Sequence, residues 1–181
     1  MRVLKVLLIA TILSLTLTAA LSAGEVPRPA PALKFTTIDG QSMSLADLKG
    51  KVVAVMFFQT TCPHCQKTTQ ILNPIYSRLK KKGLEVIGLA INKSAATDIE
   101  EFRRKYGANF PLTTSSRYET TRFAGLSVMS RFYVPYMFFI DRKGVIRFEH
   151  GGGDKEFYSD QAGNIQAELE ALLAEAPGKT S

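Results

Sequence analysis

Two segments of the chain are almost continuously apolar, residues 52–58 and residues 84–91. Runs of this length that are rich in Val, Ile, Leu and Phe are typical of strands buried on both faces of a sheet. Between them, residues 66–82 carry apolar side chains at the spacing of one helix face. These side chains belong to Ile71, Leu72, Ile75, Tyr76 and Leu79. The pattern therefore predicts a buried strand, an amphipathic helix and a second buried strand in succession.

Two turn signals, Asp39-Gly40 and the tetrapeptide at residues 141–144, each separate two segments of strand-like composition. Such signals join antiparallel strands, so each predicts a hairpin. The predicted strands cover residues 33–38 and 41–44 in the first hairpin and residues 136–140 and 145–149 in the second.

Shorter helices complete the pattern. Ser44 is suited to cap a helical turn, and Ser94 or Thr97 to cap a longer helix that stops before Gly107. The predicted helices cover residues 45–48, residues 94 or 97 to 106, residues 118–123 and residues 165–173, and residues 110–112 are predicted as a loop or short edge strand. Strands that alternate with helices in this way indicate the α/β class, a mixed sheet with helices on both faces.

The first residues have the layout of a secretory signal. Arg2 and Lys5 precede an uncharged apolar stretch, residues 6–23, that ends in small residues. We expect cleavage near Ala23, although an uncleaved stretch of this length would serve as a membrane anchor. In both cases the domain would lie outside the cytoplasm, in a periplasm or an equivalent space.

Composition adds the domain boundaries and limits the partners. The 181 residues carry a formal net charge of +7, but Lys and Arg are spread along the chain without a nucleic-acid-binding motif. We therefore assign the charge to a solvated surface and expect no nucleic-acid partner and a monomeric protein. The predicted segments are a signal at residues 1–23, an extended proline-rich linker at 24–31, a single domain at 32–176 and a loose tail at 177–181.

The candidate chemistry is in residues 61–65, Thr-Cys-Pro-His-Cys, directly after the first buried strand and before the helix. A thiol at a helix N-terminus meets unpaired N–H groups and the positive end of the helix dipole, so Cys62 should be acidic. Pro63 fits the first helical turn. His64, when protonated, would further stabilise the thiolate of Cys62. Cys65 comes round one turn later and would resolve a mixed disulfide formed at Cys62.

Other uses of two cysteines remain open. A zinc site usually needs four ligands, and the chain has two Cys and two His, so we expect no resident metal or other cofactor. A static disulfide across so short a loop would add little stability. A soft metal such as Cu(I) could be held by both thiolates, with His150 as a further ligand. A peroxidase is disfavoured because a second Cys follows the first three residues later.

With a helix-opening Cys-X-X-Cys after a buried strand and a later Pro that starts a hairpin, the chain resembles the thioredoxin fold. Within that fold it resembles the TlpA and ResA family of extracytoplasmic thiol-disulfide oxidoreductases, from about residue 32 to residue 174. The supporting motifs are residues 39–40, 45–51, 110–111 and 139–144. The resemblance implies a thioredoxin-like domain with an N-terminal hairpin extension. It also implies an enzyme that reduces or shuttles disulfides in proteins, often during cytochrome c maturation, with a membrane protein as electron donor.

By the same resemblance, Val134-Pro135 is the cis-proline loop that lies against the Cys pair and offers its backbone to a substrate. Two departures change the expected chemistry. Thr68 replaces the acidic residue that many family members carry three positions after the second Cys, which removes a proton acceptor for Cys65. Pro63-His64 and Val134 resemble the oxidase DsbA and indicate a more oxidising couple.

Two further features are a bulky segment before the proline loop and a second histidine. The segment Met129 to Tyr133 is bulky and would either dock a partner or belong to the core. His150 stands at a strand end before three glycines, where we expect a structural role.

Overall fold

The structure, a computed structural model, describes residues 25–176, so the predicted signal at residues 1–23 and the tail at 177–181 lie outside the described residues. Six strands form one mixed sheet in the order β1-β8-β7-β4-β5-β6, and β2 and β3 form a separate pair. The strands are β1 Arg28–Pro29, β2 Lys34–Thr36, β3 Ser42–Ser44, β4 Val52–Phe58, β5 Leu84–Ala90, β6 Leu112–Thr114, β7 Tyr136–Ile140 and β8 Val145–His150.

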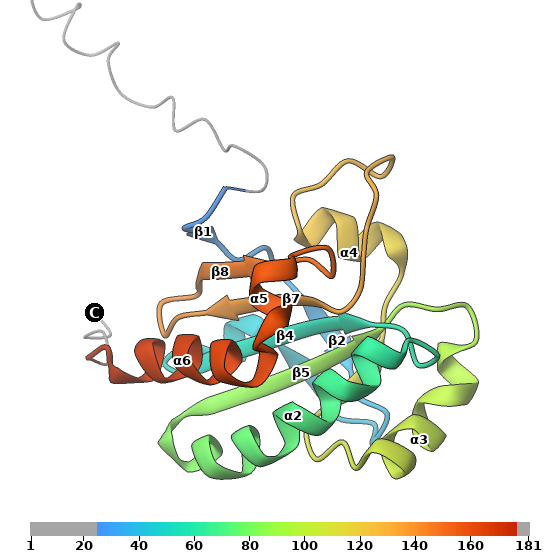
Figure 1. The fold of residues 1–181 in the computed structure, drawn as a ribbon, viewed down its shortest axis with the longest axis horizontal. Coiled ribbons are helices and arrows are strands. Elements are labelled where there is room, and N and C mark those ends of the chain that lie inside the picture. The colour runs from blue at the N-terminus through green and yellow to red at the C-terminus, as the bar shows by residue number, and fades with distance from the viewer. Residues whose placement is uncertain (1–24, 177–181) are drawn as a thin grey trace, which may run out of the picture.

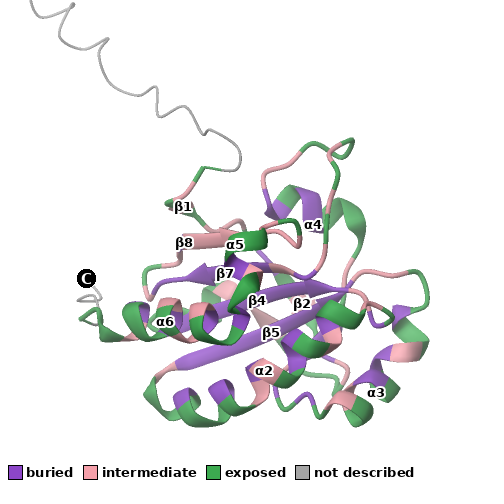
Figure 2. Cartoon of the chain, in the orientation of Figure 1, coloured by how far each residue is buried: buried purple, intermediate pink, exposed green. Residues whose placement is uncertain are grey.

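The two apolar segments are the central strands, as predicted. Every residue of β4 and β5 is buried, and the two strands run parallel. Figure 2 shows them, together with β7, as the buried layer of the molecule. The strand β6 is parallel to β5, whereas β7 and β8 form the predicted antiparallel hairpin beside β4.

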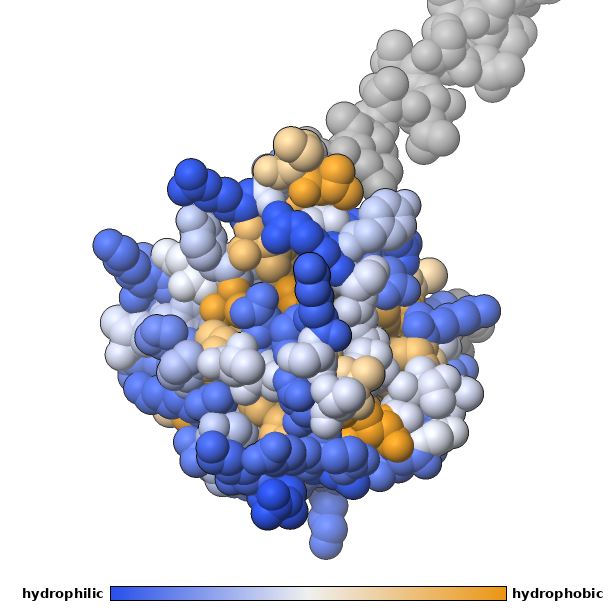
Figure 3. Space-filling view, turned by 90° about the vertical axis from the view of Figure 1, so that its right-hand side faces the viewer, coloured by the Kyte–Doolittle hydropathy of each residue, from blue (hydrophilic) through white to orange (hydrophobic). Residues whose placement is uncertain are grey.

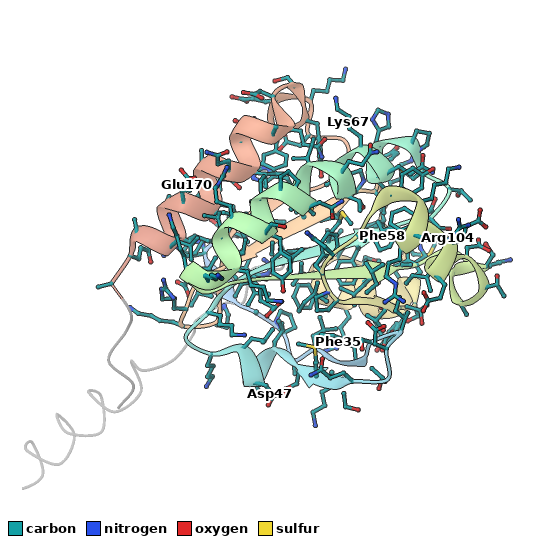
Figure 4. The ribbon with its side chains drawn as sticks, turned by 90° about the horizontal axis from the view of Figure 1, so that it is seen from below. Phe35, Asp47, Phe58, Lys67, Arg104 and Glu170 are labelled. Carbon is teal, nitrogen blue, oxygen red and sulfur yellow. The ribbon has the colours of Figure 1, made fainter. Side chains whose placement is uncertain are left out.

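Helices cover both faces of this sheet, in agreement with the predicted class. The helical elements are η1 Leu45–Leu48, α2 Pro63–Leu79, η2 Lys80–Lys82, α3 Ala95–Tyr106, α4 Arg117–Phe123, α5 Lys155–Ser159 and α6 Gln161–Ala174. Helices α2, α3, α5 and α6 share one core cluster, and α4, η1 and the β2–β3 hairpin share the other. Figure 4 shows the two layers edge-on, with Lys67 and Glu170 on one side of the sheet and Phe35 and Asp47 on the other.

The predicted amphipathic helix is α2, and its first residue is Pro63. Its last turn tightens into the 3₁₀ turn η2, and Gly83, with φ of 98°, ends it. Leu72 and Leu79 are buried against the sheet, so the periodic apolar face packs as the spacing predicted. The consequence is a rigid helix whose N-terminus lies where β4 ends.

The segment predicted as a linker takes part in the sheet. Arg28 and Pro29 pair with Ile146 and Val145 of β8, and the guanidinium of Arg28 lies 2.7 Å from the carboxylate of Glu149. Arg28 also donates to the carbonyl of Ala124, at 3.1 Å. Part of the segment predicted as an extended linker at residues 24–31 is thus a strand of the sheet, because pairing with distant residues outweighs the local proline-rich composition.

The end of the domain holds a helix that the pattern did not predict. Asp154 accepts the N–H of Phe157 at 3.0 Å and so caps α5, a helix too short to show an apolar period. The next helix, α6, then begins at Gln161, before the predicted start at residue 165. Among residues 25–176, no helix combines the length and the apolarity that crossing a bilayer requires.

Candidate active site

Cys62 is the N-cap residue of α2, and its own sulfur takes the capping role. The N–H of Cys65 donates to Cys62 Sγ at 3.3 Å. Both cysteines are free thiols; Cys62 is partly exposed and Cys65 is buried with no exposed surface. Solvent and partners can therefore approach only the first sulfur of the pair.

Hydrogen bonds to the sulfur make Cys62 acidic, as expected from its place at a helix start. The thiol of Cys65 donates to Cys62 and lowers its pKa to about 6, although partial burial works in the opposite direction. The N–H groups of Cys65 and His64 and the charge of the His64 imidazole contribute in the same sense but less. Burial raises the pKa of Cys65, which therefore keeps its proton in the dithiol form. The two sulfurs thus differ in charge as well as in exposure.

The turn before Cys62 is fixed by side chains from neighbouring elements. Asn92, which follows β5, accepts the N–H of Thr60 at 3.0 Å and donates to the Thr60 hydroxyl at 2.8 Å. Gln66 of α2 donates to the Thr60 carbonyl at 3.0 Å. Neither Asn92 nor Gln66 was singled out from the sequence, because one isolated amide carries no spacing signal. Together they hold the backbone that places Cys62.

The structure brings the predicted proline loop to the cysteines. The Val134–Pro135 peptide bond is cis, and the Val134 carbonyl lies 3.9 Å from Cys62 Sγ. Strand β7 begins at Tyr136 and pairs with β4 at Phe57, which sets the loop beside the end of β4. The backbone of Val134 and the sulfur of Cys62 therefore lie side by side at one edge of the sheet.

Thr68 occupies a polar but uncharged place below the cysteines. Its hydroxyl donates to the carbonyl of His64 at 2.8 Å and accepts a hydrogen bond from the amide of Gln161 in α6. Thr68 has no exposed surface. The resemblance associates this position with an acidic residue. Thr68 instead links α2 to α6 and supplies no carboxylate to Cys65.

Tyr158 of α5 also reaches this edge and was missed from the sequence. Its hydroxyl donates to the Pro135 carbonyl at 2.7 Å. The neighbouring His150 contacts Asp154 through Nδ1 at 2.7 Å and Glu168 through Nε2 at 2.9 Å, and its ring stacks on Phe157. The structural role expected for His150 fits these contacts. Within residues 25–176, no group of three or more His, Cys, Asp or Glu side chains is placed to hold a metal ion.

The segment Met129 to Tyr133, before the proline loop, has one side chain packed against the core and others exposed to solvent. Phe132 is partly buried, packs against the core and stacks on Tyr136 with ring centres 4.7 Å apart. Met129 is 88% exposed and Tyr133 is 55% exposed. In the described chain, the large exposed apolar side chains all lie in α4 and the loop after it, and Figure 3 shows apolar atoms gathered at the top of the molecule, where this loop lies in Figure 1.

A partly exposed, acidic thiol, a buried partner thiol one helical turn away and an adjacent cis-proline backbone define a thioredoxin-fold thiol-disulfide oxidoreductase. The fold agrees with a thiol:disulfide interchange protein of the thioredoxin family from Chlorobium tepidum TLS, which has a TM-score of 0.69 at 23% identity over 82% of this chain and 98% of that one. The chain belongs to the AhpC/TSA family, which it matches over residues 26–149.

Two further relatives are similar over most of the domain. ResA, a thiol-disulfide oxidoreductase of Bacillus thuringiensis (strain Al Hakam), is 29% identical over 122 residues, which is 67% of each chain. A crystal structure from Chlorobium tepidum, provisionally named as the thiol:disulfide interchange protein DsbE, is 26% identical with a TM-score of 0.63 and covers 80% of this chain and 98% of that one. The resemblance seen in the sequence motifs is thus matched by whole-domain similarity.

Proposed function

We propose that this protein exchanges disulfides with protein substrates through Cys62 and Cys65, with reduction of the substrate as its working direction. The observation that carries the exchange chemistry is the division between the sulfurs, whereas the reductive direction rests on the resemblance to the TlpA and ResA family. Cys62 is accessible and has a pKa of about 6, whereas Cys65 is fully buried directly behind it. An ionised sulfur is the nucleophile in disulfide exchange, and only Cys62 satisfies both requirements.

Two exchange steps would complete the reduction. The thiolate of Cys62 attacks one sulfur of the substrate disulfide, so that a mixed disulfide forms and the other substrate sulfur leaves as a thiolate. Cys65 then loses its proton to the substrate thiolate released in the first exchange and attacks Cys62 Sγ. The Cys62–Cys65 disulfide forms, the second substrate sulfur leaves, and two electrons have moved from the pair to the substrate. Thr68 offers no carboxylate to this step, so we assign the proton to the substrate thiolate released in the first exchange.

The backbone beside Cys62 is the proposed substrate site. The edge at Val134 and Pro135 would pair with an extended segment of the substrate while its disulfide meets Cys62. Pro63 and His64 would tune the thiolate from the first turn of α2. Neither role needs a bound cofactor.

The cellular setting follows from the N-terminal pattern. We place the domain outside the cytoplasm on the basis of residues 1–23, with a membrane protein as the source of electrons that returns the pair to the dithiol. Apocytochrome c, whose haem-attachment motif is itself a Cys-X-X-Cys-His sequence, is the substrate to test first. An oxidised peptide with this motif and oxidised insulin serve as specific and general substrates.

The opposite direction, introduction of disulfides into the substrate, is favoured by one observation, the low pKa of Cys62. Stabilising the thiolate makes a dithiol couple more oxidising. The reduction potential separates the two directions. A value close to that of thioredoxin, about −270 mV, supports reduction, and a value close to that of DsbA, about −120 mV, supports disulfide introduction.

The central test is a trapping experiment. Cys65→Ser should accumulate a mixed disulfide with the oxidised peptide, because no internal thiol remains to release it, and Cys62→Ser should reduce neither substrate. The Cys62→Ser protein is also the matched control, since its remaining sulfur is buried. If Cys62→Ser retains activity while Cys65→Ser captures nothing, the assigned roles are wrong.

A further inference from the structure

The back of the proline loop is held by a bracket, which we define as residues 150–158, the end of β8 together with the glycine turn and α5. The N–H of Gly152 donates to the Tyr133 carbonyl at 2.9 Å. A Cβ placed on Gly152 would lie 2.6 Å from the Val134 carbonyl oxygen, closer than such atoms approach. A glycine is therefore required here for the bracket to touch the loop backbone directly.

Tyr158 makes the second connection between the bracket and the loop. Its hydroxyl lies 2.7 Å from the Pro135 carbonyl and 3.2 Å from the His150 carbonyl. Burial raises the pKa of Tyr158, so the hydroxyl keeps its proton and stays a donor at neutral pH. Because the carbonyl of Pro135 belongs to the residue that follows Val134, this bond fixes the backbone next to Cys62.

The bracket itself is anchored to the rest of the domain. Asp154 caps α5 through the N–H of Phe157, and the same carboxylate group contacts His150 Nδ1. The other ring nitrogen of His150 contacts Glu168 in α6. Tyr158 is thus presented from a short helix that is tied to both β8 and α6, which makes it a fixed point rather than a mobile side chain.

We propose that Tyr158 is a positioning residue for substrate binding: its hydroxyl holds the Pro135 carbonyl, and thereby holds the Val134 backbone at the distance from Cys62 that a docked peptide requires. This inference rests on the proposed function, in which that backbone binds the substrate. Tyr158 does not touch the reacting sulfur atoms, so it should affect how a protein disulfide docks and leave the intrinsic reactivity of Cys62 alone.

The test is the Tyr158→Phe variant, which keeps the ring and removes the donor. Losing one such hydrogen bond should raise KM for the oxidised peptide by about three- to tenfold, with a smaller change in kcat. The rate at which iodoacetamide, which needs no docked backbone, alkylates Cys62 should be unchanged, as should the pH titration of its thiolate.

Tyr76→Phe is the matched control. The hydroxyl of Tyr76 also has a buried partner, Glu85, but that bond lies near the start of β5, at the opposite end of the sheet from Cys62. Tyr76→Phe should lower the free energy of unfolding without changing KM. Gly152→Ala, which displaces the loop at Val134 instead of at Pro135, should raise KM as Tyr158→Phe does.

The outcomes are distinguishable. An unchanged KM in Tyr158→Phe overturns the positioning role. So does a fall in the rate of Cys62 alkylation as large as the fall in kcat/KM. If the unmodified protein reduces neither the peptide nor insulin, the proposed function itself fails, and the inference fails with it.

Discussion

At the scale of single residues, the low pKa of Cys62 depends more on its partner thiol, Cys65, than on His64 between the cysteines. The hydrogen bond from Cys65 is the largest contribution to the low pKa, and the charge of His64 is the smallest of those that lower it. The sequence pointed to His64 because its charge is evident in the motif. The donor role of Cys65 depends on a rotamer and on burial, which the motif does not specify.

This ranking of contributions predicts how far each of three substitutions shifts the pKa of Cys62. Cys65→Ala should move the pKa of Cys62 furthest from about 6 toward its ordinary value of 9.0, because it removes the largest contribution. His64→Pro should have a smaller effect, since it removes an N–H and a charge, and His64→Ala the smallest, since the N–H remains. Thiolate absorbance against pH measures all three. A larger effect of His64→Ala than of Cys65→Ala would contradict the ranking.

The site was predictable from the sequence where its residues are neighbours, and it was missed where they are not. Cys62 and Cys65 follow from a motif of neighbouring residues, whereas Pro135 was assigned only through the family resemblance. Tyr158 lies in a helix of five residues, Lys155–Ser159, without a period of its own. The signal that was available is Asp154 as a cap before two aromatic residues, which indicates a helical turn but not the loop that it contacts.

At the scale of elements, long buried strands and helices were predictable because each carries its own apolar pattern. The strands β4 and β5 and the helix α2 were predicted for this reason, whereas α3 was predicted from its capping residues and from Gly107. The strand β1 was not, because its stability comes from Val145, Ile146 and Glu149, more than a hundred positions along the chain. Composition describes Arg28–Pro29 as linker, and only the folded sheet supplies its partners.

The ion pair of β1 gives a quantitative prediction. The side chains of Arg28 and Glu149 are 13% and 8% exposed, so Arg28→Met leaves a buried carboxylate without its cation. Breaking such a pair costs about 3–5 kcal/mol in free energy of unfolding, measured by urea denaturation. The double variant Arg28→Met, Glu149→Gln should lose less than Arg28→Met alone, since no uncompensated charge remains.

An exposed pair is the control for that experiment. Arg103 lies 2.6 Å from Asp39, but the two side chains are 36% and 62% exposed. Arg103→Met should cost about 1 kcal/mol or less, because solvent screens the pair. Equal losses for Arg28→Met and Arg103→Met would show that the contacts of β1 contribute little to the domain.

At the scale of the whole molecule, everything assigned to disulfide exchange lies at one edge of the sheet. Cys62 follows the end of β4, Asn92 follows the end of β5, and Pro135 precedes the start of the antiparallel β7. This end of the sheet adjoins one of the two cores, because Cys65 belongs to that core and Cys62 packs against it. The charge state of Cys62 is therefore linked to the stability of the entire domain.

The linkage predicts how stability depends on pH. In the folded dithiol, Cys62 loses its proton near pH 6, whereas an ordinary Cys does so near pH 9.0. Between these values the unfolded chain binds more protons, so the free energy of unfolding should rise with pH, by at most about 1.4 kcal/mol per pH unit and by less because Cys62 is partly exposed. Below pH 6 this contribution disappears.

The contribution of His150 to the free energy of unfolding changes with pH in the opposite sense, so it must be separated from that of Cys62. Burial lowers its pKa, but the hydrogen bonds to Glu168 and Asp154 outweigh burial and raise it above 6.5. Its contribution is present below pH 6.5 and is lost as the pH rises through the folded-state pKa. Urea denaturation of the reduced protein and of Cys62→Ser across this window isolates Cys62 as their difference. A difference that does not change with pH would contradict the low pKa.

The two edge strands of the sheet have a consequence for self-association. The strand β1 has two residues, one of them Pro29, which has no N–H to donate, and β6 at the other border has three. Each edge strand offers few free amide groups, so another polypeptide that added itself as a further strand would form few backbone hydrogen bonds. Short edge strands of this kind therefore limit self-association of the protein through added strands.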